Sequence, residues 1–287
     1  MPPNPSRRTF TLQTVALTGT TLVGAACGIT TGGKGETPHT PDTSNPSDTG
    51  SPAAEWATGG TASMTGTYDE PFTTSAGPTC DLTCAMTTGP CYAETQERRD
   101  ISEGVDGLPV RLALRVVDDA CVPVVGAVVD VWHTAPDGLY SGRDAEDLCT
   151  AGNAKALAGH WFRGVAKTDS SGRVDFDTCF PGWYNTRAVH IHFQVRKPTE
   201  YVTAQLFFDQ ALIDSICTTE PIYKVRGVPR TANADDNVLG DSDAAMYTLD
   251  VARLPDGAMM ASKTIVIRSS LAGALCGSGG SGGGVGP

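Results

Sequence analysis

The chain has 287 residues and carries 21 Lys and Arg against 32 Asp and Glu, a formal net charge of −11. A surface this acidic repels phosphate backbones, which excludes nucleic acid as a partner. Much of residues 1–78 and 277–287 consists of Thr, Gly, Ser and Pro. What remains is about 200 residues, enough for one domain with a well-buried core.

Residues 1–27 have the features of an export signal. A pair of arginines precedes Phe10, and the apolar run 15–26 is too short and too rich in Thr and Gly to span a bilayer permanently. The arginine pair resembles a twin-arginine signal, with an ordinary export signal as the alternative. Cys27 stands where a lipoprotein acceptor cysteine would, although Gly24 replaces the expected larger aliphatic residue. We expect an exported protein, extracellular or in the cell envelope, either lipid-anchored at Cys27 or simply secreted.

Three further regions follow the signal. Residues 28–78 predict a disordered linker, because they contain too few large apolar residues to offset the entropy of ordering. Residues 79–276 predict one folded domain, and 277–287 a Gly/Ser-rich tail. Of the nine cysteines, Cys27 belongs to the signal and eight remain. An even number in an oxidising compartment indicates disulfides, whose pairing the sequence does not specify.

Alternation of apolar and polar residues predicts many short strands in the domain. These are 110–116, 127–132, 162–167, 173–176, 188–196, 204–208, 247–251 and 264–268. Asp209 could cap a helix that ends at Ile216, and no other helix is expected. This pattern predicts an all-β fold, a β-sandwich of mostly antiparallel strands with little helix. Long loops at 141–159 and 218–244 must decorate it, and loops of that length are more often functional than idle.

The strongest functional signal is the stretch that ends in His190-Ile191-His192. At the period of two of a strand, both imidazoles lie on one face, while the apolar residues that alternate with them lie on the other, toward a core. Such a pair could also be two ordinary surface histidines. Tyr140 and Tyr184 in turn-rich segments upstream, and Arg187 three residues before His190, favour a functional site instead.

Two phenol oxygens and two imidazoles would form a distinctive set of metal ligands. Phenolates are hard anionic donors and imidazoles are borderline donors, so together they favour the trivalent ion Fe(III) over Zn(II). A tyrosine ordinarily titrates at about 10, so only a strong Lewis acid would hold two tyrosines as phenolates at neutral pH. The residues therefore predict a non-haem Fe(III) site.

Five segments agree with one known family in order, spacing and residue type. They are 129–142, 162–169, 180–184, 187–192 and 205–209. Together they resemble the intradiol ring-cleavage dioxygenases, in particular an exported branch akin to protocatechuate 3,4-dioxygenase. The resemblance extends over about residues 86–252.

The resemblance implies that Tyr140, Tyr184, His190 and His192 hold Fe(III), with Tyr184 at the position of the tyrosinate that leaves when substrate binds. It implies that a catechol-type diol is cleaved with O2, between its hydroxylated carbons, to a cis,cis-muconate-type product. Arg187 matches an arginine that stabilises negative charge developing on the substrate.

Gln205 matches a glutamine near the substrate ring of the family. Tyr92 follows Cys91 where the family has paired tyrosines, and we expect it at the substrate pocket as well. The divergent loop 143–160 carries Cys149, so the choice of catechol does not carry over. The oligomeric state does not follow from the sequence either.

Other polar residues have simpler interpretations. We expect His133 to support the site or lie in the core, and His160 to belong to loop structure. The pair Asp235-Asp236 lacks the spacing of a calcium loop and indicates a solvated turn.

A secreted, non-catalytic binding module of the transthyretin-like kind is the alternative hypothesis. The segments 123–127, 168–172 and 180–184 resemble the strands and turns of such modules as well. A binding module, however, has no use for Tyr140 or for the histidine pair. The complete set of four ligands therefore favours the dioxygenase.

Overall fold

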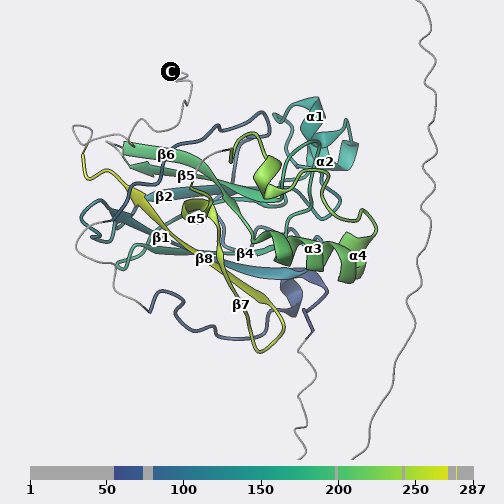
Figure 1. Cartoon of the computed structure of the whole chain (residues 1–287), viewed down its shortest axis with the longest axis horizontal. Coiled ribbons are helices and arrows are strands. Elements are labelled where there is room, and N and C mark those ends of the chain that lie inside the picture. The colour runs from purple at the N-terminus through teal and green to yellow at the C-terminus, as the bar shows by residue number, and fades with distance from the viewer. Residues whose placement is uncertain (1–54, 74–79, 198–199, 241–242, 271–275, 277–287) are drawn as a thin grey trace, which may run out of the picture. The chain divides into compact units, whose positions relative to one another are not determined.

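A computed structural model describes residues 55–73, 80–197, 200–240, 243–270 and 276 (Figure 1). The predicted export signal with Cys27, the tail 277–287 and most of the predicted linker lie outside the described residues. Within them, no helix is long and apolar enough to cross a bilayer.

Two four-stranded sheets form the body of the domain and face each other as two layers (Figure 1). The strands are β1 (Pro109–Asp118), β2 (Val128–Trp132), β3 (Arg163–Lys167), β4 (Arg173–Cys179), β5 (His190–Lys197), β6 (Glu200–Phe207), β7 (Asp250–Arg253) and β8 (Met259–Ile267). One sheet has the order β4-β1-β8-β7 and the other β3-β2-β5-β6. All neighbours are antiparallel except β1 and β8. The predicted β-sandwich of mostly antiparallel strands is confirmed.

The core lies between the sheets and is built from the alternating apolar residues of both. Leu112 and Leu114 of β1, and Val129 of β2, are completely buried there. Ile191 and Phe193 of β5 join the same cluster. The alternation along β5 therefore turns the intervening histidines away from the core, as the sequence predicts.

Several short helices lie between the strands, so the prediction of a single helix is wrong. The described helices are α1 (Asp147–Thr150), α2 (Ala154–Ala158), α3 (Gln210–Thr219), α4 (Pro221–Lys224), α5 (Ala244–Tyr247) and the 3-10 turns η1 (Gly60–Ser63) and η2 (Asn233–Asp235). Asp209 caps α3 as predicted, accepting from the backbone of Ala211 and Leu212. The others are too short to show a helical period, and the N-caps of α2 and α5, Asn153 and Asp243, are their local signals.

Residues 55–73 pack against the domain, so the predicted linker is wrong for this part of the chain. The backbone N–H of Ala57 donates to the carbonyl of Gly257 (2.8 Å), and the Tyr68 hydroxyl donates to Asp256 (2.7 Å). The guanidinium of Arg253 lies 4.0 Å from the centre of the Trp56 ring. The composition of this segment predicted disorder wrongly, because a few aromatic residues are enough to hold a polar segment when each contacts an arginine of the sheet.

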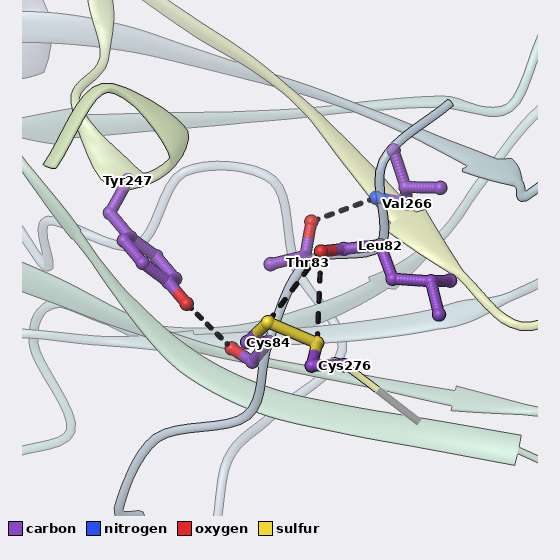
Figure 2. The surroundings of a disulfide bond; sticks show 6 residues. All are labelled: Leu82, Thr83, Cys84, Tyr247, Val266 and Cys276. Carbon is purple, nitrogen blue, oxygen red and sulfur yellow. Dashed lines mark hydrogen bonds between the residues drawn. A yellow bond between two sulfur atoms is a disulfide. The ribbon is translucent and has the colours of Figure 1, made fainter. Parts of the chain in front are cut away.

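Three disulfides join the described residues: Cys80–Cys121, Cys84–Cys276 and Cys91–Cys149. Cys179 and Cys217 are buried free thiols, so the expectation that all eight cysteines pair is wrong. Figure 2 shows how the segment before Cys84 is held: the Val266 amide of β8 donates to the Thr83 hydroxyl (3.0 Å), and the Tyr247 hydroxyl donates to the Cys84 carbonyl (3.2 Å).

Candidate metal centre

Two turns and the start of β5 bring the predicted ligands together. Tyr140 lies on the segment that follows β2, and Tyr184 lies on the loop between β4 and β5. The two turns touch at Gly182, where any Cβ would stand 2.4 Å from the carbonyl oxygen of Pro136. A residue without a side chain is therefore required at Gly182. Asn185, at φ 47°, turns the chain directly after Tyr184, a conformation that Asn tolerates.

The four predicted ligands form one compact, buried cluster. The Nε2 atoms of His190 and His192 are 3.1 Å apart, and the Tyr140 hydroxyl is 3.4 Å from His190 Nε2. The rings of Tyr140 and Tyr184 meet edge to face, with centroids 5.1 Å apart. Exposed fractions are 0% for Tyr140, 1% for His192, 3% for His190 and 7% for Tyr184. The fold thus brings Tyr140 next to Tyr184, which is 44 residues further along the chain, and next to the histidine pair on β5.

The orientation of both histidines is set by their surroundings. His190 Nδ1 donates to the carbonyl of Ala188 (2.7 Å), which leaves Nε2 as the atom that faces the other donors. The His192 ring stacks on Trp132 with centroids 4.9 Å apart and planes only 9° from parallel. Gly89 is also close to this ring, since a Cβ there would stand 3.3 Å from His192 Cε1. Packing therefore fixes both rings.

Burial determines the protonation of the cluster. Burial, with Arg187 nearby, lowers the pKa of His190 to about 3, and burial beside His190 lowers the pKa of His192 well below its usual range. Both imidazoles are therefore neutral, the form that binds metals. Burial, and then the neighbouring phenol of Tyr184, raises the pKa of Tyr140 well above its usual value. Two phenols in such a place become phenolates only beside a strong cation.

The cluster fits an iron ion in both spacing and chemistry. Two donor atoms that both bind one ion at about 2.1 Å lie no more than about 4 Å apart. The separations of 3.1 and 3.4 Å agree with that spacing. Among the described residues, no group of three or more His, Cys, Asp or Glu could hold a metal. The cluster adds the phenol oxygens of Tyr140 and Tyr184, which are hard donors, to the two imidazoles.

Beside the cluster, Arg187 is held by a buried carboxylate. Its guanidinium donates to both oxygens of Asp236, from Nε at 2.8 Å and from Nη2 at 3.0 Å. Nη2 also donates to Gln205 Oε1 (2.5 Å), and Gln205 Nε2 donates to the Thr87 carbonyl (3.2 Å). Arg187 and Gln205 thus lie together, and the roles that the resemblance implies for them stay predictions.

Asp236 is a residue that the sequence analysis placed wrongly. It is 1% exposed rather than part of a solvated turn, and it accepts from the backbone N–H groups of Ala188, Val238 and Leu239 as well as from Arg187. Burial alone would raise its pKa, but the hydrogen bonds from Arg187 and Ala188 lower the pKa of Asp236 to about 2. Locally, it looks like any Asp in a turn, so no sequence signal separates it from exposed Asp235.

Comparison with known proteins agrees with this geometry. A family model described as Dioxygenase matches residues 87–250, more than half of the chain. The chain belongs to the intradiol ring-cleavage dioxygenase family. The match contains all four residues of the cluster together with Arg187, and it favours the dioxygenase over the binding module.

Among curated relatives of this family member are two chlorocatechol 1,2-dioxygenases. The protein from Pseudomonas putida is 31% identical over 123 residues, covering 36% of this chain and 44% of the relative. The protein from Pseudomonas sp. strain P51 is 31% identical over 130 residues, covering 38% and 47%. The chain thus spans less than half the length of these relatives.

The fold is shared with a solved structure from Tetranychus urticae, an intradiol ring-cleavage dioxygenase. It has a TM-score of 0.57 and 24% identity, and the match covers 66% of this chain and 95% of that chain. The likeness extends over nearly the whole of that protein and shows the common sandwich.

Tyr92 packs at the edge of the buried group that contains Tyr140 and Tyr184. Its hydroxyl donates to the buried carboxylate of Asp130 (3.0 Å), and its ring meets Trp132 edge-on, with centroids 5.0 Å apart. Trp132 in turn stacks on His192. The Trp132 ring therefore contacts both Tyr92 and the candidate ligand His192. The part of Tyr92 in a substrate pocket stays a prediction.

Arg163, at the start of β3, is a residue near the site that the sequence analysis did not single out. It is completely buried, and its Cζ lies 5.8 Å from the centre of the Tyr140 ring. Burial lowers its pKa to about 10, so it remains a cation at neutral pH. The only sequence signal was its place inside the family-like segment 162–169.

His133 is a buried core residue, as expected, and not a member of the cluster. Its Nδ1 donates to the Thr134 carbonyl (2.8 Å), and its Nε2 accepts from the Thr178 hydroxyl (2.7 Å). Burial lowers the pKa of His133 to about 4. Both nitrogens are occupied, which leaves none for a metal.

Acid is expected to destabilise the wild-type protein more steeply than a His133→Gln variant. His133 is neutral in the folded chain down to about pH 4, whereas the unfolded chain takes up the proton near 6.5. The free energy of unfolding therefore decreases as the pH is lowered from about 6.5 to about 4, by up to about 1.4 kcal/mol per pH unit from this one residue. Urea unfolding at several pH values measures both slopes, and parallel profiles would contradict the assignment.

Proposed function

We propose that the protein is an exported, non-haem Fe(III) intradiol dioxygenase that cleaves a catechol-type diol with O2 to a cis,cis-muconate-type product. One observation carries the proposal: Tyr140, Tyr184, His190 and His192 come from separate segments and meet in a single buried cluster. Family membership supports the reaction class. The names of the chlorocatechol 1,2-dioxygenases similar to this chain support an aromatic diol as the substrate.

Tyr140, Tyr184, His190 and His192 would hold the iron. When bound, Fe(III) would supply the Lewis acidity that holds the catechol as a chelate. An electron-rich carbon of the catechol ring would then be available to O2. The neutral imidazoles would bind it through Nε2, and the phenolates of Tyr140 and Tyr184 would offset part of its charge. The buried setting excludes bulk water and strengthens each of these interactions.

Tyr184 is the ligand that we expect a catechol to displace. It lies on a loop between two strands and is 7% exposed, whereas Tyr140 is 0% exposed. The backbone N–H of Tyr140 is also tied to the Cys149 carbonyl (2.9 Å). Displacing Tyr184 would therefore require less rearrangement than displacing Tyr140, and its phenolate oxygen would be free to take up a substrate proton.

Arg187 would stabilise negative charge that develops on the substrate. Asp236 and Gln205 hold its guanidinium at a fixed position next to the cluster, so no reorganisation is needed when the charge appears. Gln205 would therefore act on the substrate through Arg187, and the family resemblance would place it near the substrate ring as well. Tyr92 would line the more distant wall of the pocket.

The N-terminal segment supports the proposed place of action. Residues 1–27 would direct export, and Cys27 could carry a lipid that keeps the enzyme in the cell envelope. The three disulfides support an oxidising compartment, since disulfides persist there and are rare in the cytosol.

The purified protein loaded with iron is expected to be red-brown, because tyrosinate transfers charge to Fe(III). Catechol added without oxygen should shift this visible band to longer wavelength, and admitting O2 should bleach the shifted band as a muconate forms. Iron content and product are measured on the same sample. A protein that stays colourless with a full equivalent of iron would contradict the proposal, and colour without a catechol shift would contradict the reaction.

A further inference from the structure

Tyr140 is part of a closed ring of contacts that runs through a disulfide. Its backbone N–H donates to the carbonyl of Cys149 (2.9 Å). Cys149 is bonded through sulfur to Cys91. From Cys91, a single arginine side chain completes the circuit of contacts back to the backbone at Tyr140.

Arg163 closes the ring with two hydrogen bonds from one guanidinium. Its Nη2 donates to the carbonyl of Cys91 (2.6 Å), and its Nε donates to the carbonyl of Ser141 (2.8 Å), the residue after Tyr140. Carbonyls on both sides of the disulfide are thus linked to the backbone at Tyr140. Arg163, Ser141, Tyr140 and Cys91 are 0% exposed, and Cys149 is 1% exposed.

The segment that carries Tyr140 is held by contacts with other parts of the chain rather than by long regular elements of its own. Between β2 and β3 it contains only α1 and α2, of four and five residues, among the described elements. Isolated helices of that length do not persist without tertiary contacts. The disulfide and Arg163 connect the segment to residues around Cys91, and both half-cystines pack in one cluster with Tyr140 and Tyr184.

We propose that the Cys91–Cys149 disulfide and Arg163 are positioning residues of the candidate iron site, which fix Tyr140 where it can bind the metal together with the two histidines. The inference rests on the proposed function. Ligands held in place before the metal arrives bind it more tightly, because ordering them costs no free energy at that moment. Residues that orient ligands typically change metal affinity by about 10–100-fold when they are replaced.

The disulfide Cys80–Cys121 offers a matched control. Its sequence separation is 41, against 58 for Cys91–Cys149, so that loss of either bond relaxes the unfolded chain to a similar degree. Neither Cys80 nor Cys121 belongs to the buried cluster that contains Tyr140. They are also outside the neighbouring buried cluster that contains Trp161. The two double variants thus share the stability effect of a lost disulfide but differ in contact with Tyr140.

The experiment compares Cys91→Ala/Cys149→Ala with Cys80→Ala/Cys121→Ala in the full chain. Apparent Fe(III) affinity is titrated against a competing chelator, the position of the visible tyrosinate band is recorded, and Tm is measured without iron. Both variants should lose Tm, and the loss should be larger for Cys91→Ala/Cys149→Ala, because Cys91 and Cys149 are buried whereas Cys80 and Cys121 are partly exposed. Only the Cys91/Cys149 variant should lose affinity, by about tenfold or more, with a shifted or weakened band.

Equal iron affinity and an unchanged band in the two variants would overturn the inference, as would equal losses in both. If the Cys91/Cys149 variant does not fold, Arg163→Lys takes its place, because it keeps the buried charge but cannot bridge both carbonyls. Wild-type affinity and band in Arg163→Lys would then overturn it. A wild-type chain that binds iron without any tyrosinate band would instead contradict the proposed function.

Discussion

Replacing His192 with alanine is expected to abolish iron retention and the visible band. His192 is 1% exposed, and its Nε2 lies 3.1 Å from that of His190, so its loss removes one of four donors from the centre of the cluster. The remaining donors include two phenols that burial keeps protonated without a strong cation. We expect the apparent Fe(III) affinity to fall by more than about 100-fold, beyond the effect of residues that merely orient ligands.

The matched control for this prediction is His133→Ala. His133 is also a completely buried histidine, but its nitrogens contact Thr134 and Thr178. Both variants lose a buried imidazole and some stability, and only the His192 variant should lose iron. Metal analysis after dialysis, together with the absorption spectrum, distinguishes them. A full equivalent of iron with an unchanged band in His192→Ala would remove His192 from the proposed site.

Replacing Arg187 with alanine is expected to spare iron binding but to impair both stability and turnover. The change leaves the Asp236 carboxylate buried without its cation, which typically costs about 3–5 kcal/mol of unfolding free energy. Backbone N–H groups of Val238 and Leu239 still reach Asp236, which places the cost toward the lower end. Loss of a fixed donor for developing charge should slow ring cleavage by about 10²–10³-fold.

Stability and catalysis separate by comparison with Arg111→Ala. Arg111 pairs with Asp177 (2.5 Å) and its side chain is 12% exposed, but it lies on β1 in the other sheet. Urea unfolding should show a loss in both variants, whereas turnover per bound iron should fall only in Arg187→Ala. Unchanged turnover in Arg187→Ala would exclude Arg187 from the reaction, and lost iron would place it in the metal site instead.

Lowering the pH from about 4 toward 2 should reduce what the Arg187–Asp236 pair contributes to the stability of the fold. The folded-state pKa of Asp236 is about 2, below its ordinary value of 3.8. A carboxyl group with a lowered folded pKa stabilises the protein above the unfolded value, and the effect is lost as the pH falls from about 4 toward 2. In Asp236→Asn this part of the acid dependence should be missing.

Much of the fold and most of the site follow from local sequence patterns. The alternation through Val189 and Ile191 decides which face of β5 is buried, so His190 and His192 must share the other face. The residue types themselves, phenol and imidazole, indicate the metal. These properties depend on neighbours within a few residues and can be read without knowing the path of the chain.

Contacts between distant segments could only come from the tertiary structure. Asp236 lies 49 residues from Arg187, and nothing near it distinguishes it from exposed Asp235. The pairing of Cys91 with Cys149, the free thiol of Cys179 and the stacking of residues 55–73 on arginines of the sheet likewise depend on which surfaces meet. A residue's burial is set by what the rest of the chain places over it. The sequence by itself therefore determined the candidate ligands, whereas the tertiary structure decided what holds them in position.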